Sequence, residues 1–219
     1  MTQTSRRGPG YLLAVGPLLL GLTVAGCGGA RAPEGSELYH ACVACHGPDG
    51  SGNLTLRAPR IAGLPAWYVG VQLRRFKSDK RGKHPDDADG LRMRAMSRQM
   101  LSDEEIDAVA QHVSQLSPAK GAPPASPSVQ SAEAAAGKSA YAPCAECHGD
   151  HGEGREELRA SPLALFDGWY IEAQFTKFKT GVRGTVADDN VGVRMREKVS
   201  TVEPGDLPKV LAYLQTLSK

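Results

Sequence analysis

The sequence predicts an all-α protein built from two small helical domains in tandem. Two observations carry this prediction. Apolar residues recur at helical spacing in both halves, and the sequence shows no long alternation of apolar and polar residues of the kind expected for strands. The chain also repeats itself, because many residues of the first half recur 102 positions later.

The duplication extends well beyond one short motif. CVACHGPDG at residues 42–50 matches CAECHGDHG at residues 144–152. The same offset pairs Gly35 with Gly137, Tyr39 with Tyr141, Trp67 with Trp169, Phe76 with Phe178, Arg81 with Arg183, Asp87 with Asp189 and Met93 with Met195. We therefore expect a first domain at residues 35–117 and a second at residues 137–219. A linker rich in Pro, Ala and Ser, at residues 118–136, joins them.

Each half has a coarse helical pattern. A first helix is expected from about Ser36 toward Cys45, and a second from about Pro65 to Ser78. The closing helix is the best marked, because residues 102–105 have the form of a capping box. The apolar face that follows consists of Ile106, Val109, Ala110, Val113 and Leu116, and the second half repeats it as Leu207, Val210, Leu211, Leu214 and Leu217. The segments that carry the late methionines are expected to be loops.

The N-terminal residues indicate export. Two arginines precede an apolar run at residues 11–25 that is too short and too glycine-rich for a membrane span. VAGC at residues 24–27 resembles the lipobox of bacterial lipoproteins. We therefore expect a signal peptide at residues 1–26, lipid on Cys27 and a tether at residues 27–34. Ordinary signal cleavage nearby, with Cys27 left as a spare thiol, remains the alternative.

Composition limits the classes of function. Of the 26 basic residues, 24 remain when the two signal-peptide arginines are removed, and the acidic residues also number 24, so the mature chain has no basic surplus for nucleic acid. Aromatic residues make up only 5%, and two small domains can each bury only a modest core. We therefore expect a group other than side chains to fill part of each interior.

The repeated C-x-x-C-H motif predicts covalent haem. Cys42 and Cys45 lie about one helical turn apart, so both sulfurs can form thioethers with the two vinyl groups on one haem edge, and His46 then faces the iron. The second half repeats the motif with Cys144, Cys147 and His148. A zinc site would need four clustered ligands, and a thioredoxin-like thiol pair would need a βαβ context that is missing here. We predict two haem c groups.

A methionine is the expected sixth ligand of each iron, because its soft thioether favours ferrous iron and raises the reduction potential. The second half contains one methionine, Met195, and Met93 lies at the matching position. Met96 stays an alternative to Met93, since the first half has one extra residue before its closing helix. Met100 adjoins that helix and is expected to fill core.

Each repeat resembles a class I cytochrome c domain, and the tandem resembles the di-haem cytochrome c4 group. The resemblance rests on the C-x-x-C-H motifs, on QLRRFKSDKRG and AQFTKFKTGVRG, on the late methionines and on the closing helix LSDEEIDAVAQHVSQL. It implies haem attachment and ligation by Cys42, Cys45, His46 and Met93, and by Cys144, Cys147, His148 and Met195. Proline often stands near the ligand methionine in such domains. Here arginines follow instead, Arg94 and Arg196, either solvated or bonded to haem carboxylates.

The expected function follows from the ligation. A haem closed by His and Met leaves no position for a substrate and exchanges single electrons. The expectation is therefore a lipid-anchored carrier on the periplasmic side of a bacterial membrane, working between a quinol-oxidising complex and a terminal oxidase or reductase. Two alternatives stay open. One is a fixed haem subunit of a respiratory complex, and the other is an enzyme of the peroxidase or thiosulfate dehydrogenase type with one open haem.

Overall fold

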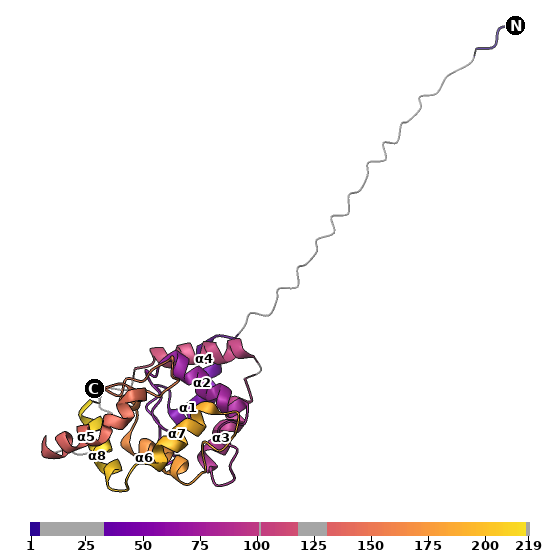
Figure 1. Ribbon diagram of the computed structural model, residues 1–219. Helices are drawn as coiled ribbons and strands as arrows, with labels where there is room; N and C mark the ends of the chain where they lie inside the picture. The colour runs from indigo at the N-terminus through magenta and orange to yellow at the C-terminus, as the bar shows by residue number, and fades with distance from the viewer. Residues whose placement is uncertain (5–32, 101, 118–130, 218–219) are drawn as a thin grey trace. The chain divides into compact units, whose positions relative to one another are not determined.

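A computed structural model describes residues 1–4, 33–100, 102–117 and 131–217, and helices are its regular secondary structure. Within these ranges there are eight α-helices, one short 3₁₀-helix and two isolated bridges, but no strand, so the all-α prediction is confirmed. The helices of both halves belong to one compact unit (Figure 1). Cys27, most of the expected signal and tether, and residues 118–130 of the expected linker lie outside the described residues.

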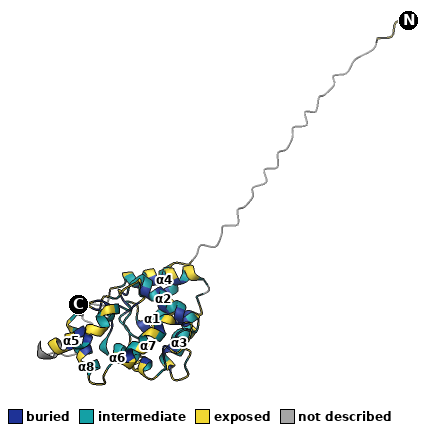
Figure 2. Cartoon of the chain, viewed as in Figure 1, coloured by how far each residue is buried: buried dark blue, intermediate teal, exposed yellow. Residues whose placement is uncertain are grey.

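The described part of the first half contains four helices, two of which pack against the last. They are α1 (Gly35–His46), α2 (Ala66–Lys77), α3 (Ala88–Ser97) and α4 (Asp103–Gln115). Helices α1 and α2 both pack against α4, and α3 packs against α2. The inward face of α4 is the predicted apolar stripe, in which Ile106, Val109, Ala110 and Val113 are at most 2% exposed (Figure 2).

The second half repeats this arrangement. Its elements are α5 (Ser131–His148), the 3₁₀-helix η1 (Leu163–Leu165), α6 (Gly168–Lys179), α7 (Asn190–Ser200) and α8 (Asp206–Leu217). Helix α8 packs against α5 and α6, and α7 packs against α6. Helix α5 starts earlier than the pattern indicated, so residues 131–136, which the sequence placed in the linker, are helical.

A close helix crossing positions each cysteine-bearing helix. A Cβ atom on Gly35 would lie 2.1 Å from the carbonyl oxygen of Ala108, and one on Gly137 would lie 2.2 Å from that of Lys209. Any side chain at either glycine would therefore force α1 away from α4, or α5 away from α8. The shared glycine of the two repeats is explained by this backbone contact.

The methionine-bearing segments are helices, so the expectation of loops there is wrong. Helix α3 carries Met93, and helix α7 carries Met195. An aspartate directly precedes each helix, and its side chain accepts a hydrogen bond from a backbone N–H of the first turn, at 3.0 Å for Asp87 and 3.1 Å for Asp189. Helix α3 has almost no apolar stripe, and α7 is short and mostly polar, so the periodicity did not reveal either helix.

Candidate functional site

The first C-x-x-C-H motif forms the last turn of α1. Cys42 is partly buried and Cys45 is exposed, and neither forms a disulfide. One turn earlier, the buried Tyr39 hydroxyl donates a hydrogen bond of 2.7 Å to the carbonyl oxygen of Gly47. Burial, together with the neighbouring Cys45, raises the pKa of Cys42 to about 11.

His46 is oriented as a metal ligand should be. The ring is buried, and its Nδ1 donates a hydrogen bond of 2.8 Å to the carbonyl oxygen of Pro59. This bond places the proton on Nδ1 and leaves the Nε2 lone pair for a metal. Burial also lowers the pKa of His46, which favours the neutral ring that metal ligation requires.

The second motif, at the end of α5, has the same supports. The Nδ1 atom of His148 donates to the carbonyl oxygen of Ser161 at 2.8 Å, and the Tyr141 hydroxyl donates to that of Gly149 at 2.8 Å. Ser161 stands 102 positions after Pro59, so the carbonyl that orients the histidine is duplicated together with the histidine. Burial raises the pKa of Cys144 and lowers that of His148.

A cavity in the second half gathers all four residues predicted to hold its haem. It has a volume of about 560 Å³, within the usual range for cofactor sites. Helix α5 contributes Cys144, Cys147 and His148, and α7 contributes Met195. Its walls include the aromatic side chains of Phe166, Tyr170, Phe175 and Phe178. The size, the donor set and the aromatic walls fit a covalently attached haem.

The three methionines of the first half have different surroundings. Met93 is partly buried on α3, at the position that Met195 has on α7. The Met96 sulfur accepts a hydrogen bond of 3.6 Å from the Gln99 side chain. Met100 packs against the core cluster of Tyr39, Val109 and Val113, as expected. The contacts of Met96 and Met100 therefore favour Met93 as the counterpart of Met195.

A set of polar residues lies where the two halves meet, and no role was predicted for them. Three residues of the first half, Tyr68, Gln72 and Arg75, line the cavity of the second half. Arg75 is bonded to Asp189, and its counterpart Lys177 is bonded to Asp87. Each half thus supplies the cation for an aspartate of the other, and that aspartate also caps the methionine-bearing helix.

A second reciprocal pair lies beside the first. Arg81 donates to Gln72 and Tyr170 at 2.7 Å and to Gln174 at 3.1 Å. Arg183 donates to Gln174 at 2.9 Å and to Gln72 at 3.3 Å. We call these residues the inter-domain cluster, which consists of Gln72, Arg75, Arg81 and Asp87 with Gln174, Lys177, Arg183 and Asp189.

The inter-domain cluster also fits the carboxylates that a haem carries. Among the described residues, the buried Nε atoms of Arg75, Arg81 and Arg183 have no hydrogen-bond partner. A buried guanidinium donor requires an acceptor, and a carboxylate is its preferred one. These arginines would hold haem carboxylates, while the cysteines, histidines and methionines would hold the ring and the iron. The iron supplies one-electron redox chemistry.

Arg94 and Arg196, the two arginines that follow the candidate ligands, differ from each other. Arg94 pairs with Asp79 rather than pointing to the inter-domain cluster, and Arg98 binds the same carboxylate. The position of Asp79 is occupied by Gly181 in the second half, so Arg196 has no aspartate at the matching position.

The sequence contains one signal for the inter-domain cluster, since Arg81 and Arg183 occupy matching positions at the 102-residue offset. The residues to which these arginines donate across the halves lie far away along the chain, so the contacts could not be predicted.

Comparison with known proteins agrees with this geometry. The cytochrome c family model matches residues 32–117 and again residues 134–218. The thiosulfate dehydrogenase electron acceptor of Thiomonas intermedia (strain K12) is 39% identical over 98 residues, which are 43% of this chain and 38% of that protein. Cytochrome c4 of Azotobacter vinelandii is 36% identical over 76 residues, 35% of this chain and 34% of that protein. The chain thus matches little more than a third of the length of these relatives.

Solved structures match over a greater length. The reduced recombinant cytochrome c4 from Pseudomonas stutzeri superposes with a TM-score of 0.63 at 25% identity, and the match covers 83% of this chain and 95% of that one. Thiosulfate dehydrogenase from Marichromatium purpuratum gives a TM-score of 0.62 at 27% identity, covering 83% of this chain and 39% of that one. Both matches extend over the two halves of the present chain.

Proposed function

This chain belongs to the cytochrome c family, with two covalent haem c groups at Cys42 and Cys45 and at Cys144 and Cys147, and on that premise we propose that it is a di-haem electron carrier. Each haem would take up and release one electron. The likeness of both halves to cytochrome c4 supports this proposal.

The observation that carries the proposal is the shared cavity of His148 and Met195. A histidine from α5 and a methionine from α7 reach one cavity, so both axial positions of the second iron can be closed by side chains. We assign His46 and Met93 the same roles in the first half. With its axial positions filled, a haem has no place for a substrate and serves electron transfer.

The proposed setting is the periplasmic side of a bacterial membrane, with a lipid on Cys27 as the anchor. The lipobox-like VAGC sequence supports this setting. None of the described helices is long and apolar enough to cross a membrane. The proposed donor is a quinol-oxidising complex, and the proposed acceptor is a terminal oxidase or reductase. The chain would meet them either as a free carrier or as a fixed haem subunit of one respiratory complex.

A second candidate donor is thiosulfate dehydrogenase. The observation in its favour is the likeness to the Thiomonas protein, which is named as the electron acceptor of that enzyme. Stopped-flow mixing of the oxidised chain with a reduced quinol-oxidising complex, and separately with thiosulfate dehydrogenase and thiosulfate, distinguishes the two donors by the rate of haem reduction.

Carbon monoxide tests the carrier role against an enzyme with an open haem. The ferrous chain is expected to show no rapid change in its haem spectrum on addition of carbon monoxide, because methionine occupies the sixth position of both irons. Rapid binding to one haem would contradict the closed ligation and would favour the peroxidase or thiosulfate dehydrogenase type of activity.

A further inference from the structure

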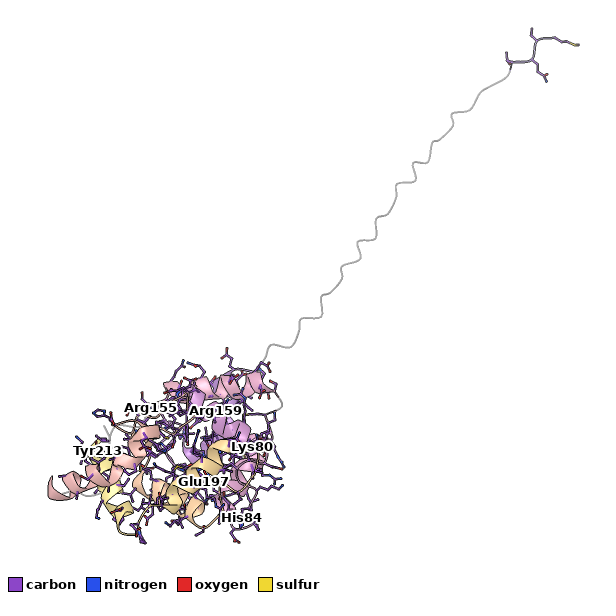
Figure 3. All side chains as sticks on the ribbon, in the orientation of Figure 1. Lys80, His84, Arg155, Arg159, Glu197 and Tyr213 are labelled. Atoms are coloured by element: carbon purple, nitrogen blue, oxygen red, sulfur yellow. The ribbon has the colours of Figure 1, made fainter. Side chains whose placement is uncertain are left out.

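The first half has an aspartate at a backbone position where the second half has glycine. Asp79 lies two residues after the end of α2, next to Lys80, which Figure 3 labels. Its φ is +64°, and Gly181, at the matching position after α6, has φ +77°. Such angles suit glycine, the usual residue just after a helix, and are unfavourable for residues with a Cβ atom. The other described non-glycine residues at positive φ, Arg57 and Arg159, match each other, so Asp79 alone among them has a glycine counterpart.

The Asp79 carboxylate binds two arginines of α3. Arg94 bonds to one carboxylate oxygen through its Nε and donates to the other at 3.3 Å, and Arg98 bonds to the first oxygen as well. Arg98 also donates to the carbonyl oxygen of Lys77, at 3.5 Å. The hydrogen bond from Arg94 lowers the pKa of Asp79, which keeps the carboxylate ionised at neutral pH. We call Asp79, Arg94 and Arg98 the Asp79 clamp.

The Asp79 clamp acts directly beside the candidate ligand of the first iron. Arg94 follows Met93 in the chain, and Arg98 lies one turn further along the same face of α3. The buried residues of α3 are Gly90 and Ser97, so large apolar side chains do not fix the rotation of this helix. The two arginines therefore fix its rotation after Met93, and with it the direction of the methionine side chain.

The start of the methionine-bearing helix is fastened alike in both halves. Arg92 donates to the carbonyl oxygen of Leu56 at 3.0 Å, and its counterpart Arg194 donates to that of Leu158 at 3.2 Å. The difference between the halves therefore lies after the methionine and not before it.

The second half has no equivalent of the Asp79 clamp. Arg196 matches Arg94, but Ser200 matches Arg98 and Gly181 matches Asp79. A Cβ atom on Gly181 would lie 3.8 Å from a terminal nitrogen of Arg196, so the arginine already stands where a carboxylate at position 181 would meet it.

A lysine fastens the end of α7 instead. Lys179 donates to three backbone carbonyl oxygens there, those of Val199, Ser200 and Val202, at 3.2, 3.1 and 2.8 Å. These contacts begin four residues after Met195, so they hold the far end of the helix and not the residue beside the ligand.

We propose that Asp79 is a positioning residue that keeps Met93 on the first iron, and that the second iron, which lacks this clamp, exchanges Met195 more readily. The proposal rests on the proposed ligation by Met93 and Met195 and not on the identity of the redox partners. It explains why the chain keeps a side chain at a backbone position that favours glycine. The two haems then have the same ligands but differ in how firmly the sixth position is closed.

Competition by imidazole tests the role of Asp79 in the ferric two-haem protein. The imidazole midpoint is the concentration at which half of the sulfur-to-iron band is lost. In a Met195→Ala background the band reports the first haem alone, and Asp79→Asn is expected to lower its midpoint about fivefold, since a partly exposed ion pair contributes up to that factor. Asparagine tolerates positive φ, so this substitution removes the charge and leaves the backbone geometry. An unchanged midpoint would overturn the proposal.

Two controls separate positioning from a general loss of stability. In a Met93→Ala background the band reports the second haem, and Asp79→Asn should leave its imidazole midpoint unchanged. Asp107→Asn is the matched substitution within the first half, because Asp107 of α4 binds Arg74 of α2 at 2.9 Å and lies outside the Asp79 clamp. It should leave the midpoint of the first haem unchanged. A shift as large as that of Asp79→Asn in either control would overturn the proposal.

Transfer of the carboxylate to the second half provides a test in the opposite direction. In the Met93→Ala background, Gly181→Asp should raise the imidazole midpoint of the second haem relative to Gly181→Asn, because only aspartate brings a negative charge to Arg196. The two variants impose the same backbone strain, so their difference reports the charge. Equal midpoints would overturn the proposal. If neither variant folds, the Asp79→Asn comparison decides.

The same spectra distinguish failure of this proposal from failure of the proposed function. Absence of the sulfur-to-iron band in the Met195→Ala background would refute ligation by Met93, on which the proposal rests. A band that is present and whose imidazole midpoint is the same with Asp79 and with Asn at that position would refute the positioning role alone. The di-haem electron carrier would then stand.

Discussion

Arg75 is bonded to Asp189 across the boundary between the halves, with both side chains more than nine-tenths buried. Breaking a buried pair by removing one charge leaves the other uncompensated and costs about 3–5 kcal/mol. Asp189→Asn should therefore lower the free energy of unfolding by about 3 kcal/mol, since asparagine can still cap α7. Urea denaturation of the two-haem protein measures this loss. The neighbouring Asp188→Asn, at an exposed position, should change the stability by less than about 0.5 kcal/mol.

The helix crossings at Gly35 and Gly137 have no room for a methyl group. Gly35→Ala and Gly137→Ala should each lower the free energy of unfolding by about 1–3 kcal/mol, because the new Cβ would overlap a carbonyl oxygen of the facing helix. Gly205→Ala is the control, since nothing lies within 4 Å of a Cβ at that position. Equal effects at the three glycines would disprove the role of the crossings.

The distal ligand of the first haem is testable by spectroscopy. Met93→Ala should remove the sulfur-to-iron charge-transfer band of one haem and lower its reduction potential, because the thioether stabilises ferrous iron. Met96→Ala, one helical turn further along α3, should leave both observables unchanged. The reverse pattern would identify Met96 as the ligand.

The proposed lipid anchor at Cys27 predicts a change in location. Cys27→Ser should release the protein from the membrane fraction, because a serine at that position cannot be lipidated. Palmitate labelling and the mass of the mature N-terminus provide the measurements. A mature chain that starts elsewhere and carries no lipid would rule out the anchor.

Local signals predicted the closing helix of the first half well. The capping box is present in the structure, where the Ser102 hydroxyl accepts from the Glu105 N–H at 3.2 Å and the Glu105 carboxylate accepts from the Ser102 N–H at 3.3 Å. The apolar stripe that follows the capping box, Ile106, Val109, Ala110 and Val113, is buried in the core. Such features depend on residues within one or two turns of each other, so a single sequence suffices to find them.

The C-x-x-C-H motifs were found for the same reason, but the orienting carbonyls of Pro59 and Ser161 were not. Each lies 13 residues after its histidine and acts through its backbone, which the side-chain type does not reveal. The inter-domain cluster was missed because Arg75 and Asp189 are 114 positions apart. The matching roles of positions 75 and 177 are also hard to see in the sequence, since the first is arginine and the second is lysine.

The central claim is that this chain is a di-haem carrier of single electrons, and a spectroelectrochemical titration of the full chain tests it most directly. Haem absorbance, followed against applied potential at known protein concentration, should show two one-electron steps per chain, both fully reversible and unaffected by carbon monoxide. One electron per chain, or a step whose potential shifts when carbon monoxide is added, would contradict the account.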